Sequence, residues 1–324
     1  MICCALLLLL LALGLVLAGG LVYLFRCSGA HLSGNCDARR ITEEQRLRGR
    51  FGSFAFAHGG FCHLVYFGPQ TPDHAKRPPV LVLHELPGLT HETFLLATRL
   101  IEQGFAVYLP LFFGEPEPLH PGQAINLKNT VLAALNGEWA PFASAKSQPI
   151  TPWLRALIRE ELVKRHPARR IGALGMCMTG AMPIALLGEP EVRAAVVCQP
   201  SLPSLACSGA ARFDLGISDA ELSAAASRSE VGVLGLRFEG DTISRGERFE
   251  TLRRRFGERF IDATIGLHEY ASSTPPIPKH AHATLTLCFY QSDTRDGAGH
   301  PNGTPSILTE RWQRLVTFLG AHLG

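Results

Sequence analysis

The longest apolar run of the chain lies at its N-terminus. Residues Cys3 to Phe25 carry no charged side chain. At about 1.5 Å of rise per residue, a helix of this length can cross the roughly 30 Å hydrocarbon core of a bilayer. The pattern therefore predicts a transmembrane anchor over residues 1–26. A cleaved signal peptide is the alternative, because Ala18-Gly19-Gly20 is a cluster of small residues, but no basic residue precedes the run and it continues past that cluster.

Charge after the apolar run sets the expected orientation. Residues 27–50 are polar and Arg-rich, which predicts a juxtamembrane linker, and no basic side chain precedes the run. The positive-inside tendency then predicts a single-pass membrane protein whose remaining chain faces the cytoplasm. Export after signal cleavage would place it outside. Cys27 and Cys36 could pair only in an oxidising compartment, so their redox state tests the orientation.

From Phe51 onward, short apolar runs alternate with amphipathic segments. Two β-rich runs around Gly59-Gly60 predict a hairpin. Fully apolar runs of strand length are typical of parallel strands buried on both faces. The predicted strands are Val80–Leu83, Phe105–Leu109, Ile171–Leu174, Ala194–Cys198, Val231–Phe238 and Leu285–Tyr290, with helices opened by caps or prolines near Thr90, Thr151, Ser218, Arg245 and Thr304. The alternation predicts one α/β domain over residues 51–324, a mostly parallel sheet with helices on both faces.

Composition narrows the functional classes. The 324 residues are 46% hydrophobic and 18% charged, enough to bury a full core, and the formal charge of +3 is spread along the chain. This argues against a nucleic-acid partner. The cysteine count, nine, is odd and the spacing irregular, which does not predict a disulfide scaffold. No motif predicts a metal site or a cofactor.

One turn carries the strongest chemical signal. Ile171-Gly-Ala-Leu-Gly-Met-Cys177-Met-Thr-Gly180 reads as a buried strand, a glycine-flanked turn and a helix start, the layout of a nucleophile elbow. The usual Gly-x-Ser-x-Gly is absent from the chain. The sequence therefore predicts a thiol nucleophile, Cys177, whose thiolate a helix N-terminus would favour.

The partners of such a nucleophile are expected after later strands. Asp241 follows the predicted strand that ends at Phe238, and His300 stands between the predicted strand Leu285–Tyr290 and the final helix. The order nucleophile, acid, histidine is that of the α/β-hydrolases. His282 is the rival histidine, ranked second because it precedes the predicted strand. Backbone N–H groups of Leu86 and Met178 are the expected oxyanion donors.

These segments together resemble the dienelactone hydrolase family. The matching pieces are Val82-Leu-His-Glu85-Leu-Pro-Gly-Leu89, Gly175-Met-Cys177-Met-Thr-Gly180, Gly240-Asp241 and Gly299-His300, and the resemblance spans about residues 51–322. It implies an α/β-hydrolase fold and a catalytic triad of Cys177, Asp241 and His300. It also implies that Glu85 holds the resting thiol and helps to form the thiolate when substrate arrives.

The chain departs from the family pattern where an anionic substrate would be held. The resemblance implies two arginines for a substrate carboxylate, one after the strand that here ends Leu109-Pro-Leu-Phe112 and one shortly after the histidine. Phe112-Phe113-Gly114 and Pro301-Asn-Gly-Thr304 stand there instead. We therefore expect an uncharged or hydrophobic small-molecule substrate, an ester, lactone or thioester, with Phe112 and Phe113 near the mouth of the site. An acyltransferase on the same scaffold and a non-catalytic membrane-anchored binding protein are the alternatives.

Overall fold

Eight strands form one sheet in the part of the chain that the structure describes. The computed structural model describes residues 51–86, 88–112, 137–140, 143–203, 209–271, 273–274, 277–286 and 305–324. The strand order is β1-β2-β4-β3-β5-β6-β7-β8. β2 pairs antiparallel with both β1 and β4, and all other pairs are parallel. The strands are β1 Gly52–His58, β2 Phe61–Gly68, β3 Pro79–Leu83, β4 Ala106–Pro110, β5 Ile171–Met176, β6 Val192–Cys198, β7 Gly232–Leu236 and β8 Phe260–Asp262.

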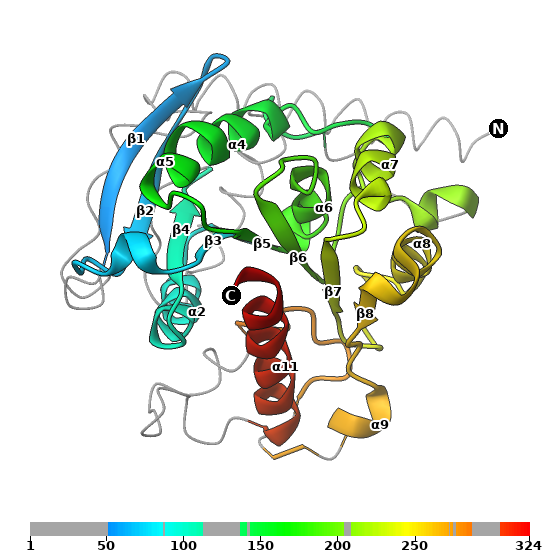
Figure 1. Cartoon of the computed structure of the whole chain (residues 1–324). Helices are drawn as coiled ribbons and strands as arrows, with labels where there is room; N and C mark the ends of the chain where they lie inside the picture. The colour runs from blue at the N-terminus through cyan, green and yellow to red at the C-terminus, as the bar shows by residue number, and fades with distance from the viewer. Residues whose placement is uncertain are drawn as a thin grey trace, which may run out of the picture.

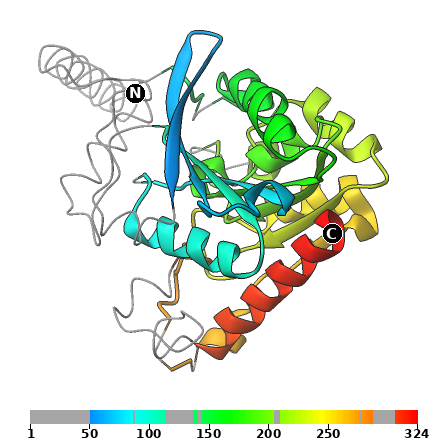
Figure 2. The ribbon, with the colours of Figure 1, turned by 60° about the vertical axis from the view of Figure 1, so that its left-hand side comes forward.

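Helices cover both faces of this sheet (Figures 1 and 2). The side chains of α2 and α11 belong to one buried apolar cluster, and those of α4, α6, α7 and α8 belong to the other. Alternate residues of each parallel strand supply the two clusters, as the two-residue period of a strand requires. The helices are α2 His91–Glu102, α4 Thr151–Leu157, α5 Val163–Arg165, α6 Met182–Leu186, α7 Asp219–Ser227, α8 Glu247–Phe256, α9 Leu267–Tyr270 and α11 Ser306–Leu323, with a π-helical turn, Ile158–Leu162, joining α4 to α5.

Local signals in the sequence found most of these elements. The hairpin turns at Gly59-Gly60, and both glycines have the positive φ that this turn requires. The Thr90 hydroxyl caps α2 by accepting from the Thr93 amide. Ser218 and Glu221 form the expected capping box at the start of α7. The predicted α/β fold with a mostly parallel sheet is therefore confirmed.

The edge strand β8 differs from the expected last strand. The sequence predicts a strand at Leu285–Tyr290, but the first two of those residues lie in a turn and residues 287–290 lie outside the described part. In the described residues the sheet instead ends at Phe260–Asp262, which pairs parallel with β7. Only Phe260 of these three residues is buried. Because β8 has three residues and two of them are exposed, its sequence shows no apolar run from which a strand could be predicted.

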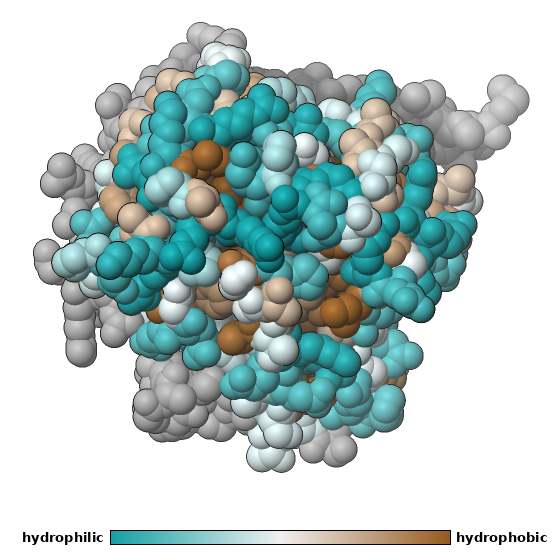
Figure 3. Space-filling model, in the orientation of Figure 1, coloured by the Kyte–Doolittle hydropathy of each residue, from teal (hydrophilic) through white to brown (hydrophobic). Residues whose placement is uncertain are grey.

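The predicted N-terminal anchor and linker, residues 1–50, lie outside the described residues. Within residues that are described, no helix combines the length and apolar character needed to cross a membrane. The face shown in Figure 3 is mainly hydrophilic, and its apolar residues form small separate groups. On this face the described residues offer no broad apolar surface for docking.

Candidate active site

A strained turn presents Cys177 at the carboxyl end of β5. Cys177 opens the 3-10 turn Cys177–Thr179 and has a φ of 54°. A positive φ is unfavourable for a residue with a Cβ, and such strain is typical of functional turns. A Cβ on Gly175 would lie 2.2 Å from the Thr179 carbonyl oxygen, and one on Gly180 would lie 2.6 Å from the Cys198 carbonyl oxygen. Both glycines are therefore required sterically, and the elbow predicted from sequence is present.

Thr179 fixes this turn against the neighbouring strand. Its side chain is buried, and its hydroxyl lies 2.9 Å from the Leu83 carbonyl oxygen, to which it can donate. The Thr179 hydroxyl oxygen also accepts a hydrogen bond from the Met176 amide at 3.0 Å. A threonine at this position thus ties the nucleophile turn to the end of β3, from which Glu85 and Leu86 follow.

The acid of the site is held by a turn after β7. Asp241 is 5% exposed, and its Oδ1 accepts from the amides of Ile243 and Ser244 at 2.8 and 3.0 Å. These two bonds leave Oδ2 free to face the site. Oδ2 lies 2.6 Å from His282 Nδ1. Asp241 is therefore both the cap of its own turn and the partner of an imidazole, where the sequence predicted it as the acid of the site.

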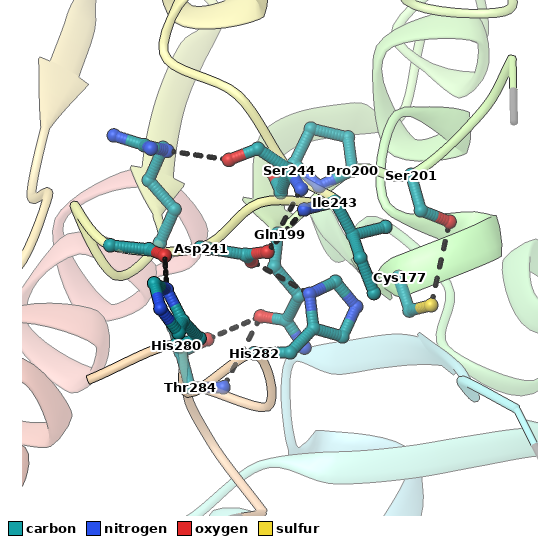
Figure 4. Close-up of polar contacts among 12 residues, drawn as sticks. Cys177, Gln199, Pro200, Ser201, Asp241, Ile243, Ser244, His280, His282 and Thr284 are labelled. Carbon is teal, nitrogen blue, oxygen red and sulfur yellow. Dashed lines mark hydrogen bonds and ion pairs between the residues drawn. The ribbon is translucent and has the colours of Figure 1, made fainter. Parts of the chain in front are cut away.

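His282 lies between this carboxylate and the side of the site where Cys177 stands (Figure 4). Burial lowers the pKa of His282, but its hydrogen bond to Asp241 and its interaction with the Cys177 sulfur outweigh burial and raise the pKa to about 10. Nε2 is buried and bonds to no polar atom of the described residues. The neighbouring His280 Nδ1 lies 2.9 Å from the Gly240 carbonyl oxygen, which holds the histidine loop against the Asp241 turn.

The histidine at Asp241 is thus the one that the sequence ranked second. His300, the preferred residue, lies outside the described residues. His282 was ranked lower because it precedes the predicted strand Leu285–Tyr290. Since β8 is the last described strand and ends at Asp262, His282 in fact follows it. The described geometry therefore favours His282 as the partner of Asp241, and the role of His300 stays a prediction from sequence.

Glu85 follows the end of β3, and its side chain accepts hydrogen bonds from residues other than Cys177. It is 4% exposed; Oε1 accepts from the Thr286 hydroxyl at 2.5 Å and Oε2 from Gln199 Nε2 at 3.2 Å. Burial raises the pKa of Glu85, and the bonds from Thr286 and Gln199 and the charge of His282 oppose that rise. The family resemblance implies that Glu85 contacts the resting thiol. Here its two oxygens accept from the Gln199 amide and the Thr286 hydroxyl instead.

His84 fixes the backbone beside Glu85. Burial lowers the pKa of His84 to about 4, so the ring is neutral at pH 7. Nε2 accepts from the Phe112 amide at 3.2 Å, which leaves the proton on Nδ1 for the Glu85 carbonyl oxygen at 3.0 Å. The ring therefore bridges the ends of β3 and β4.

Ser201 contacts the thiol and was not anticipated. Cys177 Sγ lies 3.4 Å from Ser201 Oγ, and the Ser201 amide donates to the Cys177 carbonyl oxygen at 2.9 Å. Ser201 and Gln199 both follow β6, the strand beside β5. Because carboxyl ends of neighbouring parallel strands meet at one edge, the segment after Cys198 was the signal that could have revealed them.

Phe112 and Phe113 are the residues predicted near the mouth of the site. Phe112 is fully buried and packs against the rings of His84, His63, Trp139 and Trp153, so the prediction that it lies at the mouth is wrong. Phe113 lies outside the described residues.

Leu86 and Cys177 are partly buried and pack against the apolar cluster that contains Phe112 and the buried Met178. The role of the Leu86 and Met178 amides as oxyanion donors stays a prediction from sequence. Within the described ranges, no group of three or more His, Cys, Asp or Glu side chains could hold a metal ion.

Comparisons with known proteins identify a family and a shared fold. The family model for the dienelactone hydrolase family matches residues 65–275. A structure titled as a putative dienelactone hydrolase from Klebsiella pneumoniae subsp. pneumoniae MGH 78578 is similar with a TM-score of 0.55 and 17% identity, over 83% of this chain and 98% of that one. A structure titled m3DLH is similar with a TM-score of 0.53 and 17% identity, over 85% and 98%. None of the curated proteins compared with the chain matches it.

The two structural likenesses show a shared fold, and the family model covers more than half of the chain. The strand order, with an antiparallel second strand and an elbow after β5, is the α/β-hydrolase arrangement. The chain therefore belongs to the dienelactone hydrolase family, within the α/β-hydrolase superfamily, and is a carboxylic ester hydrolase of that type.

Proposed function

We propose that the chain hydrolyses uncharged esters, lactones or thioesters through an acyl intermediate on Cys177. The observation that carries the proposal is the position of His282, bonded to Asp241 Oδ2 at 2.6 Å on one side and within electrostatic reach of the thiol on the other. A nucleophile, a base and an orienting acid in this sequence are the parts that acyl transfer needs.

The first half-reaction transfers the acyl group to sulfur. His282 Nε2 takes the Sγ proton, and the thiolate attacks the acyl carbon to form a tetrahedral oxyanion. The amides of Leu86 and Met178 would donate to that oxyanion. As it collapses, the bond to the leaving oxygen or sulfur breaks and His282 returns its proton to the leaving group. The pKa of His282, raised to about 10, stabilises the imidazolium that forms when the Sγ proton is taken and that then protonates the leaving group.

The second half-reaction releases the acid. His282 Nε2 takes a proton from water, whose oxygen attacks the thioester carbon. The new oxyanion collapses, the carbon–sulfur bond breaks, and Cys177 regains the proton from His282. Asp241 keeps the Nδ1–H tautomer throughout, so Nε2 can accept and donate in turn. When the buried Glu85 is ionised, its charge favours the imidazolium form of His282, and the charge of His282 in turn lowers the pKa of Glu85.

The preference for an uncharged acyl group rests on how the nearby arginines are used. Arg248 is buried and donates to backbone carbonyls that include those of Pro200 and Ile243, and Arg237 donates to the carbonyls of Ser244 and Glu239. Both guanidinium groups hold the loops of the site instead of a ligand. Ile243, by contrast, is 56% exposed, and Figure 4 shows its side chain directed toward the Cys177 side of the site. A substrate carboxylate at this position would contact the aliphatic side chain of Ile243.

A panel of paired esters tests this proposal. Activated esters of equal chain length are offered with and without a terminal carboxylate on the acyl group, and kcat/KM is measured for each. We expect the uncharged member of each pair to be preferred by about tenfold or more, since an unpaired carboxylate loses at least one charge-assisted hydrogen bond. Preference for the anionic member would overturn the substrate class, and hydrolysis of neither would overturn the activity.

The membrane anchor over residues 1–26 remains part of the proposal, with export after cleavage as the alternative. One observation bears on the orientation: Cys62, on β2, is disulfide-bonded. Disulfides persist in oxidising compartments and are rare in the cytosol. This supports a hydrolase domain on the extracytoplasmic side, against the orientation that the positive-inside tendency predicts. Protease protection of the domain in sealed membranes distinguishes the two.

A further inference from the structure

A buried glutamine connects two parts of the site that are distant in sequence. Gln199 directly follows β6 and is fully buried. Its Nε2 donates to Glu85 Oε2 at 3.2 Å. Its Oε1 accepts from the Thr284 hydroxyl at 2.5 Å and from the Thr284 amide at 3.3 Å. Thr284 is two residues after His282, so one side-chain amide joins the end of β3 to the histidine loop.

The chemistry of these partners fixes the orientation of the amide. A carboxylate only accepts, and the Thr284 amide only donates. If the Gln199 side chain were rotated by 180°, its oxygen would face the Glu85 carboxylate and its NH2 group would face a donor. The observed orientation is therefore the one that satisfies all three partner groups, and Gln199 cannot exchange its two contacts.

The backbone of Gln199 is also held in an unusual conformation. Its φ is 31°, and its amide donates to the Leu236 carbonyl oxygen at 2.7 Å. Such a φ is costly for a residue with a Cβ and persists only where the surroundings impose it. The chain thus carries a strained, fully buried polar residue beside the nucleophile turn, and neither the packing of β6 nor the triad requires an amide there.

We propose that Gln199 is a positioning residue that holds the Glu85 carboxylate in place and couples it to the loop that carries His282. The inference rests on the proposed function in that Glu85 acts on the thiol site. Through its amide, Gln199 stabilises the ionised form of a carboxylate that burial disfavours. Through its carbonyl, it keeps Thr284, and with it His282, at a fixed place relative to that charge.

A double-mutant cycle on the reactivity of Cys177 tests the coupling without requiring ester hydrolysis. Wild type, Gln199→Met, Glu85→Gln and the double variant are treated with iodoacetamide across a pH series, and Cys177 alkylation rates are determined by peptide mass spectrometry. Removing the amide donor destabilises ionised Glu85. The inflection that depends on Glu85 should therefore move about one to two pH units upward in Gln199→Met, the size expected for a hydrogen bond to a charged group.

In the Glu85→Gln background, Gln199→Met should leave the profile unchanged, because no carboxylate remains to titrate. An equal shift in both backgrounds, no shift in either, or a wild-type profile without a Glu85-dependent inflection would overturn the inference. The matched control is Gln148→Met, which removes another buried amide, one that bonds Ala140 N and Gly216 O, and should not move the inflection.

A second variant and an activity assay distinguish loss of the coupling from misfolding and from loss of the proposed activity. Should Gln199→Met not fold, Thr284→Val removes the hydroxyl that donates to Gln199 Oε1 and should shift the inflection upward by less. Ester hydrolysis is assayed on unalkylated aliquots of the same variants. Coupling without hydrolysis would refute the proposed function and leave the role of Gln199, whereas hydrolysis without coupling would refute the role of Gln199 alone.

Discussion

Replacing His282 by glutamine is expected to lower kcat for ester hydrolysis by at least about 10⁴-fold, as loss of the base does in serine hydrolases. Glutamine can still bond Asp241 but cannot accept and return a proton. His300→Gln is expected to lower kcat far less, because Asp241 Oδ2 already bonds His282 Nδ1. Initial rates with an uncharged p-nitrophenyl ester measure both, and thermal unfolding shows that each variant is folded.

The paired design separates the two histidines directly. A large loss in His300→Gln with little loss in His282→Gln would contradict the assignment of the base. Replacing His282 should also change kcat more than KM, because its imidazole acts on the reacting atoms and not on substrate binding.

Replacing Asp241 by asparagine is expected to lower kcat by about 10⁴-fold while the turn stays intact. The asparagine Oδ1 can still accept from the Ile243 and Ser244 amides. Its NH2 group, however, would face His282 Nδ1, which must then become an acceptor. The imidazole proton would move to Nε2, and Nε2 could no longer take the proton of the thiol.

Asp214→Asn is the matched control for this variant. Asp214 also accepts from two backbone amides, those of Gly216 and Ala145, and contacts no residue of the triad. We expect it to retain nearly full kcat with a small loss of stability. Retention of more than a tenth of the activity in Asp241→Asn, measured with the same ester, would argue that Asp241 only forms its turn.

Those parts of the fold that depend on local signals were predictable from sequence. Helix caps such as Thr90 and Ser218, the glycine pair of the hairpin and the apolar runs of the central strands each act within a few residues. The nucleophile turn was predictable for the same reason, because Gly175 and Gly180 are demanded by contacts close in sequence or directly beside the turn.

The rest of the site depends on contacts between distant segments. The short strand β8 is held by pairing with β7, and without it the order of the histidines along the sheet could not be deduced. The burial of Phe112 is set by rings from β2, α4 and the residue Trp139, which no local pattern reveals. The partners of Glu85 come from positions 199 and 286, so only the folded chain brings them together.

Acyl transfer to Cys177 is the central claim, and mass spectrometry of the protein during turnover tests it most directly. Wild type and Cys177→Ala are mixed with an uncharged p-nitrophenyl ester, quenched in acid within the first turnovers, and digested. The account predicts one acyl group on the peptide that contains Cys177, none on Cys198, whose pKa burial raises, and no hydrolysis by Cys177→Ala. An acyl group on Ser201, the 3.4 Å neighbour of the thiol, or undiminished hydrolysis by Cys177→Ala would contradict it.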